Sequence, residues 1–204
     1  MHLWVLRGWS SRPTLGVMPR LLHLNGLPGT GKSTLARRYV GEHRLALNLD
    51  IDLLRRELGH WQDISTASGL QARRLAIAVT RQHLADGYDV VVPQLVARPD
   101  FLTQLHGVAT DTGADFVEVV LRASLGTVES RFATRTEAGA EPQHVEAAQL
   151  LGDVDPRAAL EQMSADLDTL MRDVPGHIDV LTDGASPEES YLALLVALGD
   201  VPGA

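Results

Sequence analysis

Short apolar runs alternate along the chain with longer segments in which apolar residues recur at helical spacing. The apolar runs predict five strands, at residues 21–25, 45–49, 89–92, 116–121 and 178–181. Helices are expected from residue 31 onward and at residues 52–58, 68–86, 101–110, 125–138, 145–151, 156–172 and 187–198, with Ser68 as one N-cap. Strands that alternate with helices favour parallel pairing. The pattern therefore predicts an α/β fold with a doubly wound, five-stranded parallel sheet, whose ligands bind beyond the carboxyl ends of the strands.

The chain of 204 residues is long enough for one such domain with a full core, and we expect this domain to cover residues 18–204. Residues 1–17 are interpreted as an N-terminal extension, because their apolar stretch is shorter than a signal-peptide core. Apolar runs along the chain are also shorter than a membrane span. The expected location is therefore cytoplasmic, without a membrane partner.

Composition narrows the chemistry further. The formal net charge of −8 does not favour a nucleic-acid partner. The absence of cysteine excludes disulfides, thiolate catalysis and cysteine-based zinc sites. Among the 18 basic residues there is a single lysine, Lys32, so any function that requires an ammonium group falls to that residue.

Residues 26–33 read GLPGTGKS and match the phosphate-loop pattern G-x-x-x-x-G-K-[ST], between an expected strand and an expected helix. Glycines allow backbone torsions and a close approach that a Cβ would block, and the successive N–H groups then attract phosphate. In this pattern Lys32 serves the β- and γ-phosphates, Ser33 binds Mg²⁺ and Thr34 donates to the α-phosphate. ATP and Mg²⁺ are therefore the expected cofactors, and the nucleotide-binding residues are Gly26, Gly29, Thr30, Gly31, Lys32, Ser33 and Thr34.

Two aspartates follow the second predicted strand. In extended chain, the spacing of Asp50 and Asp52 puts both carboxylates on one face, towards the phosphate loop one strand away. Asp50 suits a Mg²⁺-bound water, and Asp52 suits the orientation or deprotonation of an acceptor hydroxyl. Arg55 can pair with Asp52 or contact the substrate. The alternative for either aspartate is a helix N-cap, with Asp52 capping a helix that begins at Leu53.

The GLPGTGKST run, the DxD-LLR run at residues 50–55 and a later arginine-bearing helix resemble small P-loop kinases. This kinase-type group of AAA ATPases includes zeta-toxin, chloramphenicol phosphotransferase, gluconate kinase and polynucleotide kinase. The resemblance covers residues 20–199 and implies a nucleoside-monophosphate-kinase-like P-loop NTPase fold, with a lid at about residues 136–152. It also implies that Asp52, with Arg55, occupies the position of the catalytic base and that Asp50 occupies the earlier acidic position.

The third predicted strand ends in Pro93 and Gln94, where P-loop proteins often carry an acidic residue. Asp50 would therefore have to serve the Mg²⁺, and a ring-forming AAA+ motor is not favoured. Gln94 lies at the substrate edge, where it suits a hydrogen bond to a neutral substrate. An ordinary loop residue is the alternative at this position.

Arg131 and Arg135 are four residues apart on a predicted helix before the lid. In the kinases that this passage resembles, such a pair reaches over ATP, one arginine against the base or ribose and one against the transferring phosphate. A surface stripe paired with glutamates is the alternative. Arg122 is a further phosphate candidate, and residues 182–184 are a further candidate for the adenine side.

Trp61 lies in the segment that covers the acceptor in P-loop kinases, although packing in the core is an equal alternative. We therefore expect a kinase that moves the γ-phosphoryl of ATP to a hydroxyl of a small molecule, of antibiotic, sugar or nucleoside type. Asp52, Lys32, Arg131 and Arg135 are the expected catalytic residues, and Asp52, Arg55, Trp61 and Gln94 the expected substrate residues. A zeta-toxin-like nucleotide-sugar kinase and a non-catalytic ATP-binding switch module stay open, as does the oligomeric state.

Overall fold

The computed structural model describes residues 18–137 and 155–200, with residues 132–137 described by their backbone alone. The expected N-terminal extension (residues 1–17) and the helix expected at residues 145–151 lie outside this part of the chain, as does the expected lid from residue 138 onward. Within the described part, no helix is both long and apolar enough to cross a membrane.

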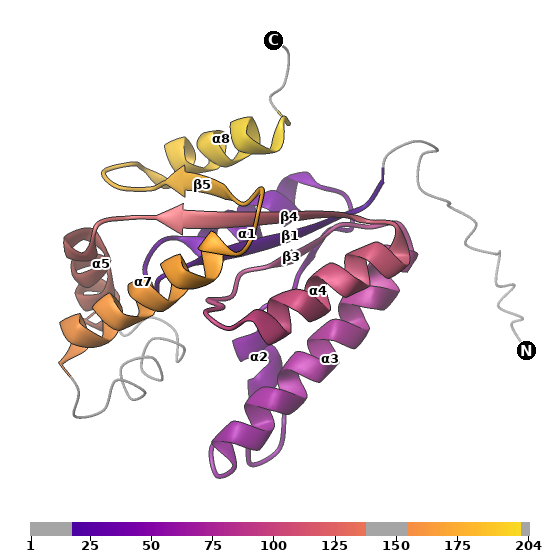
Figure 1. Ribbon diagram of the computed structural model, residues 1–204, viewed down its shortest axis with the longest axis horizontal. Coiled ribbons are helices and arrows are strands. Elements are labelled where there is room, and N and C mark those ends of the chain that lie inside the picture. The colour runs from indigo at the N-terminus through magenta and orange to yellow at the C-terminus, as the bar shows by residue number, and fades with distance from the viewer. Residues whose placement is uncertain (1–17, 138–154, 201–204) are drawn as a thin grey trace, which may run out of the picture.

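Five strands form one parallel sheet, as the sequence predicts, and their order in the sheet is β2-β3-β1-β4-β5 (Figure 1). Their bounds are Leu47–Asn48 for β2, Val90–Val92 for β3, Arg20–Gly26 for β1, Asp115–Arg122 for β4 and Ile178–Leu181 for β5. Strands β1 and β3 are almost wholly buried and β4 is buried from Glu118 to Leu121, which explains why apolar residues predominate in these strands. Since all the strands are parallel, their carboxyl ends lie at the same edge of the sheet.

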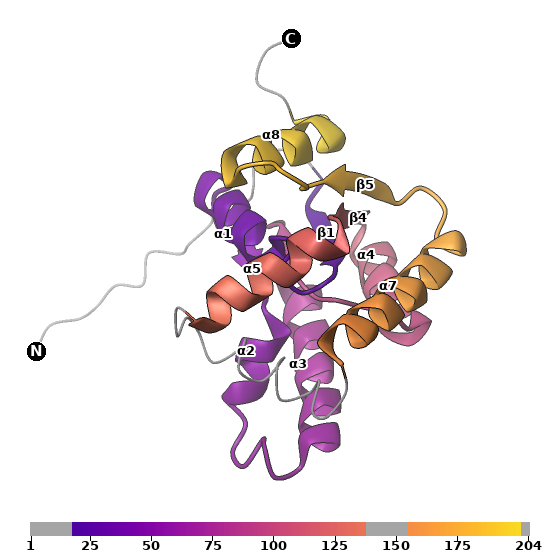
Figure 2. The same ribbon diagram turned by 90° about the vertical axis from the view of Figure 1, so that its left-hand side faces the viewer.

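Helices cover both faces of this sheet. One face packs against α1 (Lys32–Glu42) and α8 (Pro187–Leu198), and the other against α3 (Ser65–Ala85), α4 (Pro99–Thr112) and α7 (Pro156–Arg172) (Figures 1 and 2). The alternation of β1 matches this division, because Leu22 and Leu24 belong to the α1/α8 core while Leu21 belongs to the opposite one. A smaller cluster of Leu27, Val128 and Leu160 packs the phosphate loop against α5 (Leu125–Glu137) and α7.

Several helices begin earlier than expected, and α4 begins at Pro99 rather than at residue 101. Ser68 is not an N-cap, because α3 begins at Ser65 and encloses Ser68, whose hydroxyl donates to the carbonyl oxygens of Trp61 and Ser65. Helix α2 (Ile51–Arg56) is capped by Asp50 rather than by Asp52. The side chain of Asp50 accepts from two backbone N–H groups of the first turn, which fixes the start of α2 directly after β2.

Candidate active site

The loop between β1 and α1 adopts a conformation that requires its glycines. Gly26 has φ +133°, Gly29 +86° and Gly31 +99°. A Cβ on Gly26 would lie 2.6 Å from the carbonyl oxygen of Leu121, and one on Gly29 would lie 3.3 Å from that of Val128. The backbone therefore passes against β4 and α5 where no larger residue fits, and this locally encoded geometry is what the sequence pattern predicts.

Lys32 folds back over this loop. Its Nζ donates to the carbonyl oxygens of Gly26 at 2.8 Å and of Leu27 at 2.9 Å. The buried Thr30 hydroxyl also donates to the Leu27 carbonyl, at 2.8 Å, so Thr30 stabilises the loop from inside. The contacts of the single lysine of the chain thus include two neutral carbonyl oxygens of the loop, and an anionic phosphate is a stronger partner than either of these oxygens.

Helix α1 presents its N-terminus to the loop without a side-chain cap. Gly31 occupies the N-cap position and makes no side-chain hydrogen bond, and the first turn contains no acidic residue. Lys32, Ser33 and Thr34 form that first turn and are partly exposed. The orphan N–H groups and the positive end of the helix dipole therefore favour an anion here.

Asp50 and Asp52 are arranged by the start of a helix rather than by strand alternation, which corrects the expected reason for their placement. The N–H groups of Asp52 and Leu53 donate to Asp50 Oδ1 at 3.0 and 3.2 Å. Asp50 is buried, whereas Asp52 lies exposed in the first turn of α2. Both cap bonds go to one oxygen of Asp50, so the cap itself leaves Oδ2 for a hard cation or its water.

Arg131 of α5, one arginine of the predicted pair, lies beside the phosphate loop. Its guanidinium donates to the carbonyl oxygens of Thr182 at 2.8 Å, Ala185 at 3.4 Å and Gly29 at 3.5 Å. Arg131 thereby joins α5, the phosphate loop and the segment after β5. The side chain of Arg135 lies outside the described residues.

The segment after β5 borders an open hollow next to Arg131. The hollow has a volume of about 430 Å³ and is lined by Gly126, Thr127, Ser130, Arg131, Gly184 and Ala185. Asp183 accepts a hydrogen bond from Ser124 Oγ at 3.1 Å. Hydrogen bonds from Thr127 and Ser124 lower the pKa of Asp183, and the charge of Arg131 acts in the same direction. The structure therefore brings residues 182–184 and Arg131 together at one edge of the loop.

Arg55 and Trp61, both predicted substrate residues, contact each other. The guanidinium of Arg55 lies 5.1 Å from the centre of the Trp61 ring, within the range of a cation–π contact. Arg55 also donates to the hydroxyls of Ser65 and Ser68, which ties α2 to the start of α3. The two residues thus lie side by side in the part of the chain that follows β2. Trp61 is partly exposed rather than packed in the core.

Gln94 lies two residues after the end of β3, and its Oε1 is buried with no hydrogen-bond partner in the described structure. A buried acceptor without a donor is unfavourable. Arg122, by contrast, is engaged by two carboxylates, because it donates to Asp168 and to Asp179. Its side chain therefore ties the end of β4 to α7 and β5.

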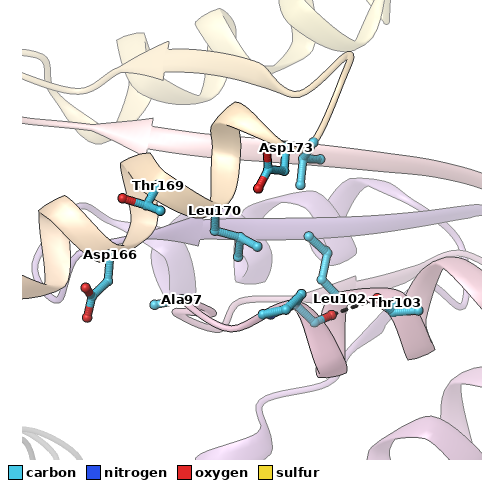
Figure 3. Close-up of a pocket in the computed structure, with 9 residues that line it drawn as sticks. Ala97, Leu102, Thr103, Asp166, Thr169, Leu170 and Asp173 are labelled. Carbon is cyan, nitrogen blue, oxygen red and sulfur yellow. Dashed lines mark hydrogen bonds between the residues drawn. The ribbon is translucent and has the colours of Figure 1, made fainter.

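A second hollow, of about 350 Å³, lies away from the phosphate loop (Figure 3). Leu102 of α4 and Leu170 of α7 lie on opposite sides of it, and Ala97 of the segment after β3 borders it.

Among the described residues, no three His, Cys, Asp or Glu side chains come together as a metal site. A Mg²⁺ ion bound near the phosphate loop would keep waters and share the oxygens of the nucleotide, as is usual for this ion.

Sequence reasoning missed a buried polar cluster directly below the loop. His23 and Asn25 of β1 and Glu118 of β4 hydrogen-bond to one another through Glu118 and are 4% exposed or less. The signal available in the sequence was the pair of polar residues inside the apolar run LLHLN.

Residues 21–153 match the protein family described as AAA domain. No curated protein matches the chain significantly.

The solved structures that share the fold over most of the chain include two kinases and an antibiotic resistance protein. The APS kinase of Mycobacterium tuberculosis in complex with AMPPNP and APS is 22% identical, with 89% of this chain and 98% of that chain covered and a TM-score of 0.58. A gluconokinase of Sinorhizobium meliloti 1021 is 19% identical, with 89% and 93% covered and a TM-score of 0.57. The tunicamycin resistance protein of Deinococcus radiodurans is 16% identical, with 91% and 99% covered and a TM-score of 0.56. The fold is that of P-loop kinases.

Proposed function

The chain belongs to the AAA domain family, and from this premise we propose that it is a kinase that moves the γ-phosphoryl group of ATP to a hydroxyl of a small molecule. The observation that carries the proposal is the phosphate loop, in which the one lysine of the chain lies over backbone that only glycine can form. A gluconokinase, an APS kinase and a tunicamycin resistance protein share the fold, which agrees with a small acceptor.

Nucleotide binding is assigned to the loop and the start of α1. The backbone N–H groups of residues 26–33 would surround the β-phosphate, and Lys32 would exchange its carbonyl partners for the β- and γ-phosphates. Thr34 would donate to the α-phosphate. The hollow beside Arg131 would receive the adenosine part, because it opens next to the loop and is bordered by residues 184–185.

Mg²⁺ is assigned to the Ser33 hydroxyl and the carboxylate of Asp50, both of them hard oxygen donors. When bound, the ion would neutralise negative charge on the nucleotide phosphates. The buried cap geometry of Asp50 supports this assignment, because it orients the carboxylate independently of the ligand.

Asp52 is proposed as the base. It accepts the proton of the acceptor hydroxyl as that oxygen forms its bond to the γ-phosphorus, while the bond to the β–γ bridging oxygen breaks and ADP leaves. Lys32 and Arg131 would stabilise the charge that develops on the phosphoryl oxygens, together with Arg135. The exposed position of Asp52 in the first turn of α2 lets an acceptor reach it.

The acceptor side is assigned to Arg55, Trp61 and Gln94. The stacked Arg55–Trp61 pair offers a flat apolar and cationic surface, which suits a sugar or an aromatic group. The buried Oε1 of Gln94 favours an acceptor or a loop movement that brings a hydrogen-bond donor.

The test is a screen of acceptors with ATP labelled in the γ-phosphate. Sugars, nucleosides, aminoglycoside and nucleoside antibiotics, nucleotide sugars and a small-molecule fraction of cell extract would be incubated with the protein and Mg²⁺. We expect a phosphorylated product, identified by mass spectrometry, that is absent with the Lys32→Ala variant. Phosphorylation of nucleotide sugars alone would identify the zeta-toxin-like activity. Tight binding of AMPPNP without any phosphorylated product would contradict the kinase proposal and favour a switch module.

A further inference from the structure

The buried cluster of His23, Asn25 and Glu118 lies between the phosphate loop and the acceptor side. Asn25 directly precedes Gly26, and Glu118 stands opposite His23 in the register of β1 and β4. His23 and Asn25 are 0% exposed and Glu118 is 4% exposed. They point to the α3/α4/α7 face of the sheet, like Leu21 two residues earlier in the strand.

Asn25 uses the full hydrogen-bonding capacity of its amide. Its Oδ1 accepts from the N–H of Gly26 at 2.9 Å and of Val96 at 3.0 Å. Its Nδ2 donates to the carbonyl oxygen of Val96 and to Glu118 Oε1, both at 3.0 Å. One side chain therefore holds the first peptide of the phosphate loop and a residue of the segment after β3 at the same time.

His23 and Glu118 share a proton. His23 Nε2 lies 3.0 Å from the carbonyl oxygen of Gln94, which only accepts, so this nitrogen carries a hydrogen. Nδ1 lies 2.6 Å from Glu118 Oε2, and this contact requires one proton between the two atoms. The pair is then neutral overall, as imidazolium and carboxylate or as imidazole and carboxylic acid, which makes its burial tolerable.

The acceptor-side segment, residues 93–97, depends on these contacts. It has no regular secondary structure, and the cluster binds its backbone at Gln94 and at Val96. On another side, Ala97 borders the hollow of about 350 Å³ rather than packed side chains (Figure 3). Val96 itself is buried in the core and Leu95 packs against it, so the segment is held by packing and by the hydrogen bonds of the cluster together.

We propose that His23, Asn25 and Glu118 are positioning residues that couple the phosphate loop to the acceptor-side segment, so that nucleotide binding fixes the segment for the acceptor. This inference rests on the proposed function for what the two sides bind. The coupling passes through Gly26, whose N–H donates to Asn25 and whose carbonyl oxygen accepts from Lys32. When nucleotide binds, Lys32 turns to a phosphate while the phosphates hold the N–H groups of the loop, and Asn25 transmits this ordering of Gly26 to Val96.

Hydrogen exchange measured by mass spectrometry tests the coupling without any turnover. Exchange of the amides of residues 94–97 would be compared with and without AMPPNP and Mg²⁺ in the wild type and three variants, with AMPPNP affinity measured by calorimetry. Glu118→Gln is the matched control, because its Oε1 still accepts from Asn25 and its Nε2 donates to His23 Nδ1. Glu118→Leu breaks both bonds. The double variant His23→Leu with Glu118→Leu replaces both partners by apolar groups and leaves no buried charge unpaired.

In the wild type and in Glu118→Gln, AMPPNP is expected to slow exchange of residues 94–97. In Glu118→Leu and the double variant, exchange in the presence of AMPPNP is expected to be about tenfold faster than in the wild type, with nucleotide affinity within about threefold. A role in stability alone would lower protection with and without nucleotide and keep the nucleotide-dependent difference.

Three results would overturn the coupling: an unchanged segment when AMPPNP binds the wild type, a wild-type response in the double variant, or loss of the response in Glu118→Gln. The exchange measurements on the wild type and on Glu118→Gln test the coupling even if an apolar variant fails to fold. Failure of the proposed function is a separate result, since it appears as absent AMPPNP binding or absent product, not as binding without a response in the segment.

Discussion

The guanidinium of Arg131 donates to the carbonyl oxygen of Thr182 at 2.8 Å, although the two residues lie 51 positions apart in the chain. The contact closes the space between α5 and the segment after β5 at the edge of the phosphate loop. Since the same guanidinium also reaches Gly29 and Ala185, one side chain sets the shape of the proposed adenosine site.

Arg131→Ala is therefore expected to weaken AMPPNP binding about tenfold, because it removes a cation and three backbone contacts from that site. Isothermal calorimetry measures the change. Arg81→Ala is the matched control, since Arg81 pairs with Asp111 at the exposed surface and its loss should leave the affinity unchanged. Wild-type affinity in Arg131→Ala would contradict the assignment of the hollow beside it.

Lys32→Ala is expected to lower nucleotide turnover by about 100-fold or more, because no other ammonium is present to neutralise the transferring phosphate. Lys32→Arg should not restore it, since a planar guanidinium does not fit where a point charge is held over the loop. The rate of ADP release measures turnover in both variants. Arg37→Ala, which removes an exposed basic residue of the same helix, should keep turnover. Turnover in Lys32→Ala at the level of this control would remove the basis of the kinase proposal.

Gly26→Ala is expected to destabilise the protein by about 2–4 kcal/mol and to weaken nucleotide binding. The added Cβ would lie 2.6 Å from the Leu121 carbonyl oxygen, in a φ region that disfavours side chains. Thermal unfolding provides the readout. Gly107→Ala in α4 is the control, because its Cβ meets nothing within 4 Å and alanine favours a helix by about 0.5–1 kcal/mol over glycine. Equal melting temperatures for the two variants would show that the loop relaxes around the added methyl group.

These residues show which parts of the molecule sequence alone predicts. The phosphate loop is predictable because its conformation depends on glycines within eight consecutive positions. The bounds expected for the helices at residues 156–172 and 187–198 agree with α7 and α8, because Asp155 and Ser186 cap them and a proline opens each one. The strands follow from buried apolar runs for the same local reason.

Other features depend on contacts between distant residues. The choice of Asp50 rather than Asp52 as the cap is set by where edge strand β2 ends against β3, and the strand pairs only at Leu47 and Asn48. The pairing of His23 with Glu118, 95 positions away, follows from the order β1–β4 in the sheet. No local pattern contains that order, so the polar residues of β1 gave no indication of their partners.

Asp183 provides a pH-dependent prediction. Its pKa is lowered in the folded protein by hydrogen bonds from Thr127 and Ser124 and by the charge of Arg131, so it contributes stability above the unfolded value of about 4. That contribution to stability is lost as the pH falls through the lowered pKa that Asp183 has in the folded protein. Asp183→Asn should therefore be less stable than the wild type at pH 7 and should converge with it in acid. Melting temperatures of both proteins, measured from pH 7 down into the acid range, test this prediction. A difference in melting temperature that does not change with pH would contradict the role of the charge.

Kinetic measurements should distinguish the roles of Asp50 and Asp52 at the start of α2. Asp52→Asn is expected to lower kcat by about 10²–10⁴-fold while AMPPNP affinity stays unchanged, because the amide cannot accept the hydroxyl proton. Asp50→Asn should keep the fold, since asparagine caps a helix as well as aspartate does. Its defect should be a higher Mg²⁺ requirement, measured as turnover against Mg²⁺ concentration. Full turnover in Asp52→Asn would show that another group accepts the proton, and an unaltered Mg²⁺ dependence in Asp50→Asn would show that the cap is the whole role of that carboxylate.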